Sequence, residues 1–168
     1  MSRIITLTCT LLIVFAGCGT DEDNPTPQGP KATGALVSVE GCKSFIRTSG
    51  DEKNKSCLHW NYSAASGTLD LNHENAGFNC CPQAINASVE IEGQIITVYE
   101  SEVGPDCRCN CLYDLHIRIE NLAEDSYVIR MVEPYRHKDD DELLVPVDLR
   151  NAPSGSLCVP RFNYPSGQ

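Results

Sequence analysis

From residue 35 onward, apolar and polar positions alternate along the chain with a period of two rather than 3.6. Successive side chains of a strand point to opposite faces, so this alternation predicts β-strands that have one buried and one solvated face. Eight strands are predicted, at residues 36–40, 57–62, 68–73, 85–92, 94–100, 107–120, 127–133 and 143–149. No run of ten or more residues carries the apolar stripe of an amphipathic helix.

Turn-forming residues separate the predicted strands. Gly, Pro, Ser and Asp cluster at residues 49–51, 66–67, 104–106 and 152–155, which is typical of turns. Glu92-Gly93 lies between two strand-like runs and predicts a tight hairpin. Short strands joined by frequent turns favour an all-β fold. We expect a single antiparallel β-sandwich of about seven or eight strands over residues 35–168.

The first residues combine a basic start with a short apolar run. Arg3 precedes an apolar stretch at residues 4–15, and Ala16-Gly17 follows it. The stretch is shorter than the roughly 20 residues that a membrane-spanning helix needs, so it predicts an export signal that is removed.

Phe15-Ala16-Gly17-Cys18 resembles the lipobox of bacterial lipoproteins. The resemblance implies that residues 1–17 are a signal peptide and that the acylated Cys18 anchors the protein in a membrane. Gly19 is not Asp, which by the same resemblance implies an outer membrane lipoprotein, either periplasmic or surface-exposed. Residues 18–34 hold three prolines and no bulky apolar side chain, so they predict a solvated, acidic tether.

The charge of the chain narrows the range of partners. The 168 residues carry a formal net charge of −10, and removal of residues 1–17 takes away one base and no acid. A surface this negative repels phosphate backbones, so nucleic acid is not expected as a partner. The expected contacts are the membrane, through the lipid, and a carbohydrate, peptide or protein ligand. No cofactor is expected.

Eight of the ten cysteines lie in the expected domain, and they predict a disulfide framework in an exported chain. They are Cys42, Cys57, Cys80, Cys81, Cys107, Cys109, Cys111 and Cys158. Cys107, Cys109 and Cys111 lie in the strand predicted at 107–120. They share the face of its apolar residues and are expected to point inward. Residues two apart on a strand are about 6.6–6.8 Å apart, at or beyond the usual span of a disulfide, so these three are not expected to pair together. One pairing that satisfies this condition joins Cys42 to Cys57. It pairs Cys80, Cys81 and Cys158 with the row formed by Cys107, Cys109 and Cys111.

Two other chemistries remain open for these cysteines. The Cys107/Cys109/Cys111 row, with Cys80, Cys81 and His73, offers soft ligands for zinc or copper, or a redox-active pair. No pair has the Cys-x-x-Cys spacing of zinc knuckles or of thioredoxin-like proteins, which favours structural disulfides over both.

Few other residues suggest a site. Trp60 and Tyr62 share one face of a predicted strand, where an aromatic pair forms either core or a platform for a sugar ring. His73 lies at the polar end of a predicted strand, in an expected loop, and is a further binding candidate. A hydrolase is another alternative, although the chain has no Gly-x-Ser-x-Gly motif, and no catalytic residue is assigned.

Three segments, at residues 76–82, 107–115 and 155–159, resemble parts of a group of uncharacterised cysteine-rich lipoproteins of Gram-negative, Bacteroidetes-like bacteria. They read Ala-Gly-Phe-Asn-Cys-Cys-Pro, Cys-Arg-Cys-Asn-Cys-Leu-Tyr-Asp-Leu and Gly-Ser-Leu-Cys-Val. The resemblance implies no activity and no catalytic or binding residue. The expected protein is therefore a cell-envelope lipoprotein that acts as a non-enzymatic binding or structural module.

Overall fold

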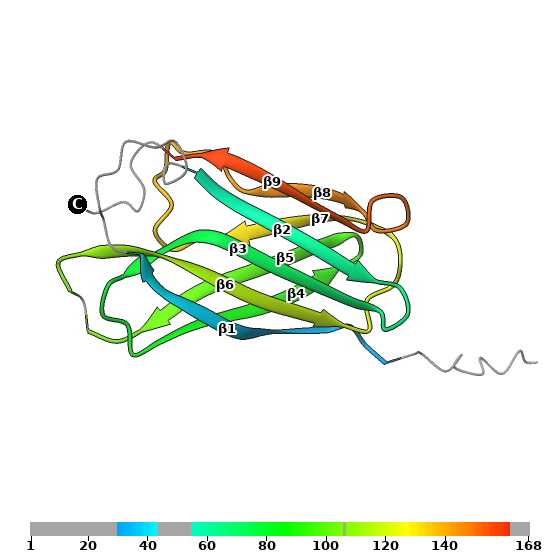
Figure 1. The fold of residues 1–168 in the computed structure, drawn as a ribbon, viewed down its shortest axis with the longest axis horizontal. Coiled ribbons are helices and arrows are strands. Elements are labelled where there is room, and N and C mark those ends of the chain that lie inside the picture. Colours follow the sequence, from blue (N-terminus) through cyan, green and yellow to red (C-terminus); the bar gives the residue numbers. More distant parts are fainter. Residues whose placement is uncertain (1–29, 44–54, 106, 162–168) are drawn as a thin grey trace, which may run out of the picture.

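The computed structural model describes residues 30–43, 55–105 and 107–161, and the described residues form nine β-strands and no helix (Figure 1). The strands are β1 (Thr33–Lys43), β2 (Lys55–Ser63), β3 (Thr68–Asn79), β4 (Ala84–Glu92), β5 (Ile95–Val103), β6 (Asn110–Glu120), β7 (Ser126–Val132), β8 (Leu144–Asp148) and β9 (Ser154–Pro160). The all-β prediction is confirmed.

All nine strands belong to one sheet, in the order β8-β7-β5-β4-β1-β6-β3-β2-β9. The sheet curls so far that it is nearly barrel-shaped, and its two halves face each other across the core (Figure 1). Neighbouring strands are antiparallel except β5 and β7, which are parallel. The prediction of an antiparallel sandwich of seven or eight strands is therefore wrong in its details: the sheet is mixed, continuous and has nine strands.

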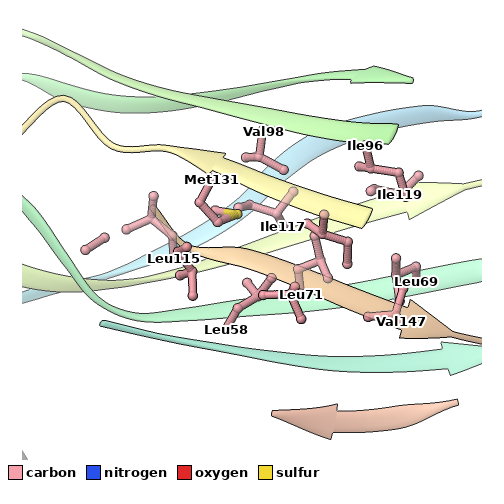
Figure 2. Packing of buried hydrophobic residues seen from close by; sticks show 14 of the residues in the cluster. Leu58, Leu69, Leu71, Ile96, Val98, Leu115, Ile117, Ile119, Met131 and Val147 are labelled. Atoms are coloured by element: carbon pink, nitrogen blue, oxygen red, sulfur yellow. The ribbon is translucent and has the colours of Figure 1, made fainter. Parts of the chain in front are cut away.

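The inward-facing positions of both halves meet in one core. Side chains from β2, β3 and β6 pack against side chains from β5, β7 and β8 (Figure 2). Leu58, Leu71 and Ile117 from the first half, and Ile96 and Ile129 from the second, are fully buried. Since each CH₂ removed from water contributes about 0.8 kcal/mol, this shared core stabilises the contact between the two halves of the sheet.

All eight predicted strands are present, with shifted ends. Glu92 lies opposite Ile95, so Gly93 and Gln94 form a two-residue turn, and the predicted hairpin is confirmed. Gly93 has a φ of 58°, a conformation that such a turn requires and that favours glycine. The ninth strand, β9, was not predicted, because Pro153 and the glycine and serines around it indicated only a turn.

The N-terminal predictions lie outside the described residues. These are the signal peptide at 1–17, the lipidated Cys18 and the tether up to residue 29. Thr33 and Gly34, which were expected in the tether, lie in β1. Within the described ranges, no helix is long and apolar enough to cross a membrane.

Candidate functional site

The eight cysteines of the domain form four disulfide bonds. The pairs are Cys42–Cys111, Cys57–Cys158, Cys80–Cys109 and Cys81–Cys107. As predicted, each cysteine of the 107/109/111 row pairs with a cysteine elsewhere, and two of the partners are Cys80 and Cys81. The suggested Cys42–Cys57 bond and the suggested link from Cys158 to the row are wrong. Cys57 and Cys158 are instead directly opposite each other on β2 and β9, the strand that was not predicted.

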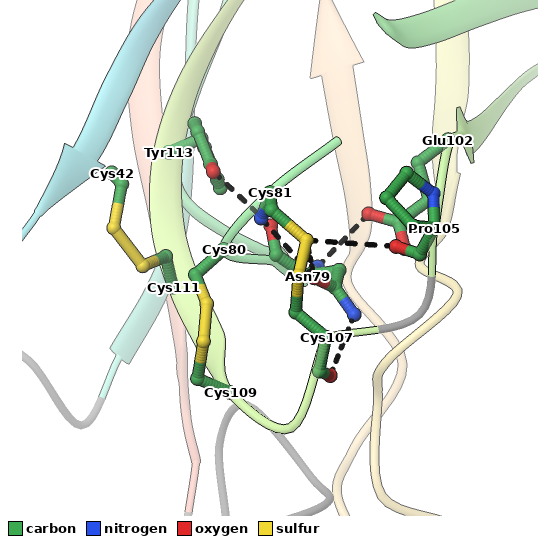
Figure 3. The surroundings of a disulfide bond; sticks show 10 residues. All are labelled: Cys42, Asn79, Cys80, Cys81, Glu102, Pro105, Cys107, Cys109, Cys111 and Tyr113. Carbon is green, nitrogen blue, oxygen red and sulfur yellow. Dashed lines mark hydrogen bonds between the residues drawn. A yellow bond between two sulfur atoms is a disulfide. The ribbon is translucent and has the colours of Figure 1, made fainter. Parts of the chain in front are cut away.

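Three of the disulfides gather where β3 ends and β6 begins, as Figure 3 shows. Asn79, the last residue of β3, holds this end together. Its side chain donates to Cys107 O at 3.0 Å and accepts from Cys81 N at 3.1 Å, and its carbonyl accepts from the Tyr113 hydroxyl at 3.1 Å. The arrangement crosslinks the ends of β1 and β3 to the start of β6.

The prediction that all three cysteines of the row point inward holds for one of them only. β6 begins at Asn110, so Cys107 and Cys109 precede the strand. Cys111 is 5% exposed, whereas Cys107 is half-buried and Cys109 is exposed. The alternation of the 107–120 segment is therefore a true strand signal only from residue 110 onward.

Five polar side chains form a buried polar layer at one end of the core: Ser56, His73, Glu100, Glu133 and Arg161. The first four continue the inward-facing alternation of their strands, next to the core residues Leu58, Leu71, Val98 and Met131. His73 is fully buried in β3 rather than in the expected loop. The side chains of both glutamates and of Arg161 are also completely buried.

Hydrogen bonds link the layer into one network. His73 Nδ1 lies 2.5 Å from Glu100 Oε1, and His73 Nε2 lies 2.7 Å from Ser56 Oγ. Ser56 Oγ donates to Glu133 Oε1 at 3.1 Å, and the other oxygen of Glu133 accepts from Arg161 Nη2. Arg161 also donates to the carbonyl of Asp141. Burying charges is costly unless they are paired, and here two carboxylates face two cationic side chains.

The charge state of His73 follows from its surroundings. Burial alone would lower its pKa, but the Glu100 carboxylate at Nδ1 and the nearby Glu133 outweigh that effect and raise the pKa of His73 above its ordinary value. The hydrogen bonds suit an imidazolium that donates from both nitrogens, because Glu100 accepts at Nδ1 and the Ser56 hydroxyl, which points its proton at Glu133, accepts at Nε2. Ser56 accepts the Nε2 proton and gives its own proton to Glu133.

This proton arrangement bears on catalysis. Ser56, His73 and Glu100 have the connectivity of a Ser–His–acid triad, in which a neutral imidazole takes the serine proton. A protonated His73 cannot take that proton, and Ser56 is 0% exposed, so no substrate reaches its hydroxyl. The layer is suited to holding strands together and not to nucleophilic attack.

The raised pKa of His73 predicts a pH dependence of stability. The contribution of His73 protonation to the free energy of unfolding is complete below the ordinary imidazole pKa of 6.5. It is lost as the pH rises through the higher pKa that His73 has in the folded protein. Within that window, the free energy of unfolding is expected to fall by about 1.4 kcal/mol per pH unit.

Urea unfolding between about pH 6 and pH 9 measures this slope. His73→Gln should remove it, whereas His116→Gln, which changes a partly exposed histidine on the outer face, should keep it. An unchanged slope in His73→Gln would show that another group titrates.

The two aromatic candidates do not share an open surface. Tyr62 is buried and donates from its hydroxyl to Leu122 O at 2.9 Å. Trp60 packs against Gly155, where an added Cβ would lie 2.3 Å from its ring, and its indole donates to Ala152 O at 3.2 Å. Both rings are part of the packing between β2 and its neighbours.

The outer face of β2, β3 and β6 carries two His–carboxylate pairs. His59 Nε2 lies 3.1 Å from Glu74 Oε2, and His116 Nε2 lies 3.3 Å from Asp70 Oδ1. Ligand atoms of His59 and Glu74 also come within 4.8 Å of Cys57 Sγ. While Cys57 is bonded to Cys158, it has no thiolate to offer a metal.

The outer face of β5, β7 and β8 is more apolar. Six of the eight large hydrophobic side chains that are exposed among the described residues lie on these three strands: Ile95, Tyr99, Val103, Val128, Val132 and Leu144. Ile95, Val128 and Pro146 are aligned by the strand register, beside a hollow of about 480 Å³. Exposed apolar patches of this kind mark interaction surfaces.

No protein-family model, no curated protein and no solved structure matches this chain.

Proposed function

We propose that the protein is a cell-envelope lipoprotein whose disulfide-crosslinked β-domain acts as a non-enzymatic binding or structural module, anchored through an acylated Cys18. The observation that carries the proposal is that all eight cysteines of residues 35–168 are paired in four disulfides. Such bonds persist in oxidising compartments outside the cytoplasm, which supports an envelope location.

A binding or structural role is supported by the distribution of polar groups. The Ser–His–acid connectivity lies in the core with its charges paired, and the exposed apolar side chains of β5, β7 and β8 offer contact area to a ligand. The outer membrane, reached through the lipid, is the proposed site of anchoring. A peptide or protein ligand suits the apolar face better than a sugar, because Trp60 and Tyr62 are engaged in packing.

Two alternatives are weaker. A hydrolase is favoured only by the connectivity of Ser56, His73 and Glu100, and the protonated His73 opposes it. A metal centre at Cys107, Cys109 and Cys111 would require free thiolates, whereas each of the three is held in a disulfide. A redox-active pair among these cysteines is opposed by the lack of a Cys-x-x-Cys spacing.

The experiment that tests the anchor is membrane fractionation of a Cys18→Ser variant in a Gram-negative host. Wild type is expected in the outer-membrane fraction and the variant in the soluble fraction, because acyl chains contribute about 0.8 kcal/mol per buried CH₂. Cys9→Ser, which removes the other cysteine of the N-terminal segment, is the matched control and should stay with the membrane. A Cys18→Ser protein that still sediments with membranes would overturn the proposal.

A further inference from the structure

We propose that Cys57, Cys158, His59 and Glu74 form a redox-gated metal site, in which reduction of the Cys57–Cys158 disulfide frees two thiolates that join the imidazole and the carboxylate around one Zn²⁺ ion. The inference goes beyond the proposed function and does not depend on membrane anchoring. Two Cys, one His and one carboxylate supply four donors of the types that zinc prefers in tetrahedral sites.

The strand register brings the four donors together. Cys57 on β2 is directly opposite Cys158 on β9 and Glu74 on β3. His59 is two residues further along β2 and therefore projects from the same face as Cys57. Ligand atoms of Cys57, His59 and Glu74 already lie within 4.8 Å of one another. Zinc lies about 2.0–2.3 Å from each ligand, so donors that share one ion are under about 4.6 Å apart, and small side-chain rotations achieve this.

The backbone keeps this geometry after the disulfide opens. β2 pairs with β9 from Lys55↔Pro160 to Asn61↔Ser154, on both sides of the cysteines, and β2 pairs with β3 on its other edge. Three other disulfides remain elsewhere in the domain. Two freed thiols would therefore stay opposite each other instead of separating.

The exposure of the site allows both reduction of the Cys57–Cys158 disulfide and binding of a metal ion. Cys158 is exposed on an edge strand, and the side chains of His59 and Glu74 are 43% and 40% exposed, so a reductant and a metal ion can approach. A dithiol reductant gives two electrons to the disulfide, becoming a disulfide itself while Cys57 and Cys158 become thiols. Zinc binding then releases one proton from each thiol.

A Cys158→Ser variant tests the site without any reductant, because it frees the Cys57 thiol and leaves the other three disulfides intact. Titration with Co²⁺, a spectroscopic substitute for zinc, should give one bound ion per chain with a thiolate-to-cobalt charge-transfer band. Adding His59→Ala should weaken binding at least about tenfold. Adding His116→Ala, which removes the histidine of the other His–carboxylate pair, should leave it unchanged. Absence of the band, or equal effects of the two histidine substitutions, would overturn the site.

A second measurement tests the redox gate in the wild-type protein. One equivalent of dithiothreitol per chain is added with or without Zn²⁺, free thiols are alkylated, and the labelled cysteines are mapped by mass spectrometry. Zinc should protect Cys57 and Cys158 from alkylation, and the untreated oxidised protein should bind no Co²⁺ with a thiolate band. Alkylation of both cysteines regardless of zinc would refute the gate even where Cys158→Ser binds cobalt.

Discussion

Replacing Glu133 by Gln is expected to lower the free energy of unfolding by about 3–5 kcal/mol, because the change removes the carboxylate that pairs with the buried guanidinium of Arg161. Glu133 accepts hydrogen bonds from Ser56 and from Arg161, and the side chains of Glu133 and Arg161 are completely buried. Arg161 cannot relieve the loss by releasing its proton, since a guanidinium stays charged in proteins. Urea unfolding of the variant at neutral pH measures the effect.

Glu142→Gln is the matched control for this prediction. It removes a carboxylate from an ion pair with Arg130 in which the two side chains are 40% and 50% exposed, so it should cost less than about 1 kcal/mol. The double variant Glu133→Leu/Arg161→Leu removes both charges and should recover part of the loss. Equal costs for Glu133→Gln and Glu142→Gln would show that the layer is not held by charge pairing.

The alternation of side chains predicted the strands well because it reports a local property, the burial of one strand face. All eight predicted strands exist, and their apolar positions fill the core. The pattern did not predict β9. Gly155, on its inner face, has no side chain because the ring of Trp60 fills that space, and its outward positions carry Ser156 and Cys158. Strand order and the parallel β5–β7 pair depend on long-range contacts, which no local pattern contains.

The buried polar layer had a signal in the sequence that was not recognised. Glu100 and Glu133 each lie two residues after an inward-facing core residue, Val98 and Met131 respectively, and so they face inward too. Ser56 lies two residues before the core residue Leu58 in the same way. A carboxylate at an inward position is informative, because it must meet a cation or a donor in the core. The partner Arg161 carried no such signal, since it follows a strand that was not predicted.

Removing the Cys57–Cys158 disulfide through Cys57→Ala/Cys158→Ala is expected to lower the free energy of unfolding by about 4 kcal/mol. The two cysteines are 101 residues apart, the largest separation among the four bonds. In the chain-entropy description, a crosslink over about 100 residues contributes about 4.7 kcal/mol. The value expected here is smaller, because Cys42–Cys111 already shortens the path between the two ends. Urea unfolding under non-reducing conditions measures the loss.

Cys81→Ala/Cys107→Ala provides the comparison, because it opens a loop with a sequence separation of only 26 residues. Its loss should be well below the roughly 3 kcal/mol expected for an isolated loop of this size, because Cys80–Cys109 already joins the residues next to it. The two variants also remove disulfides from different parts of the sheet. Because β9 is an edge strand that pairs only with β2, hydrogen exchange in Cys57→Ala/Cys158→Ala should accelerate first in β9. Faster exchange across the whole sheet instead would mean that this bond stabilises the entire fold and not one edge alone.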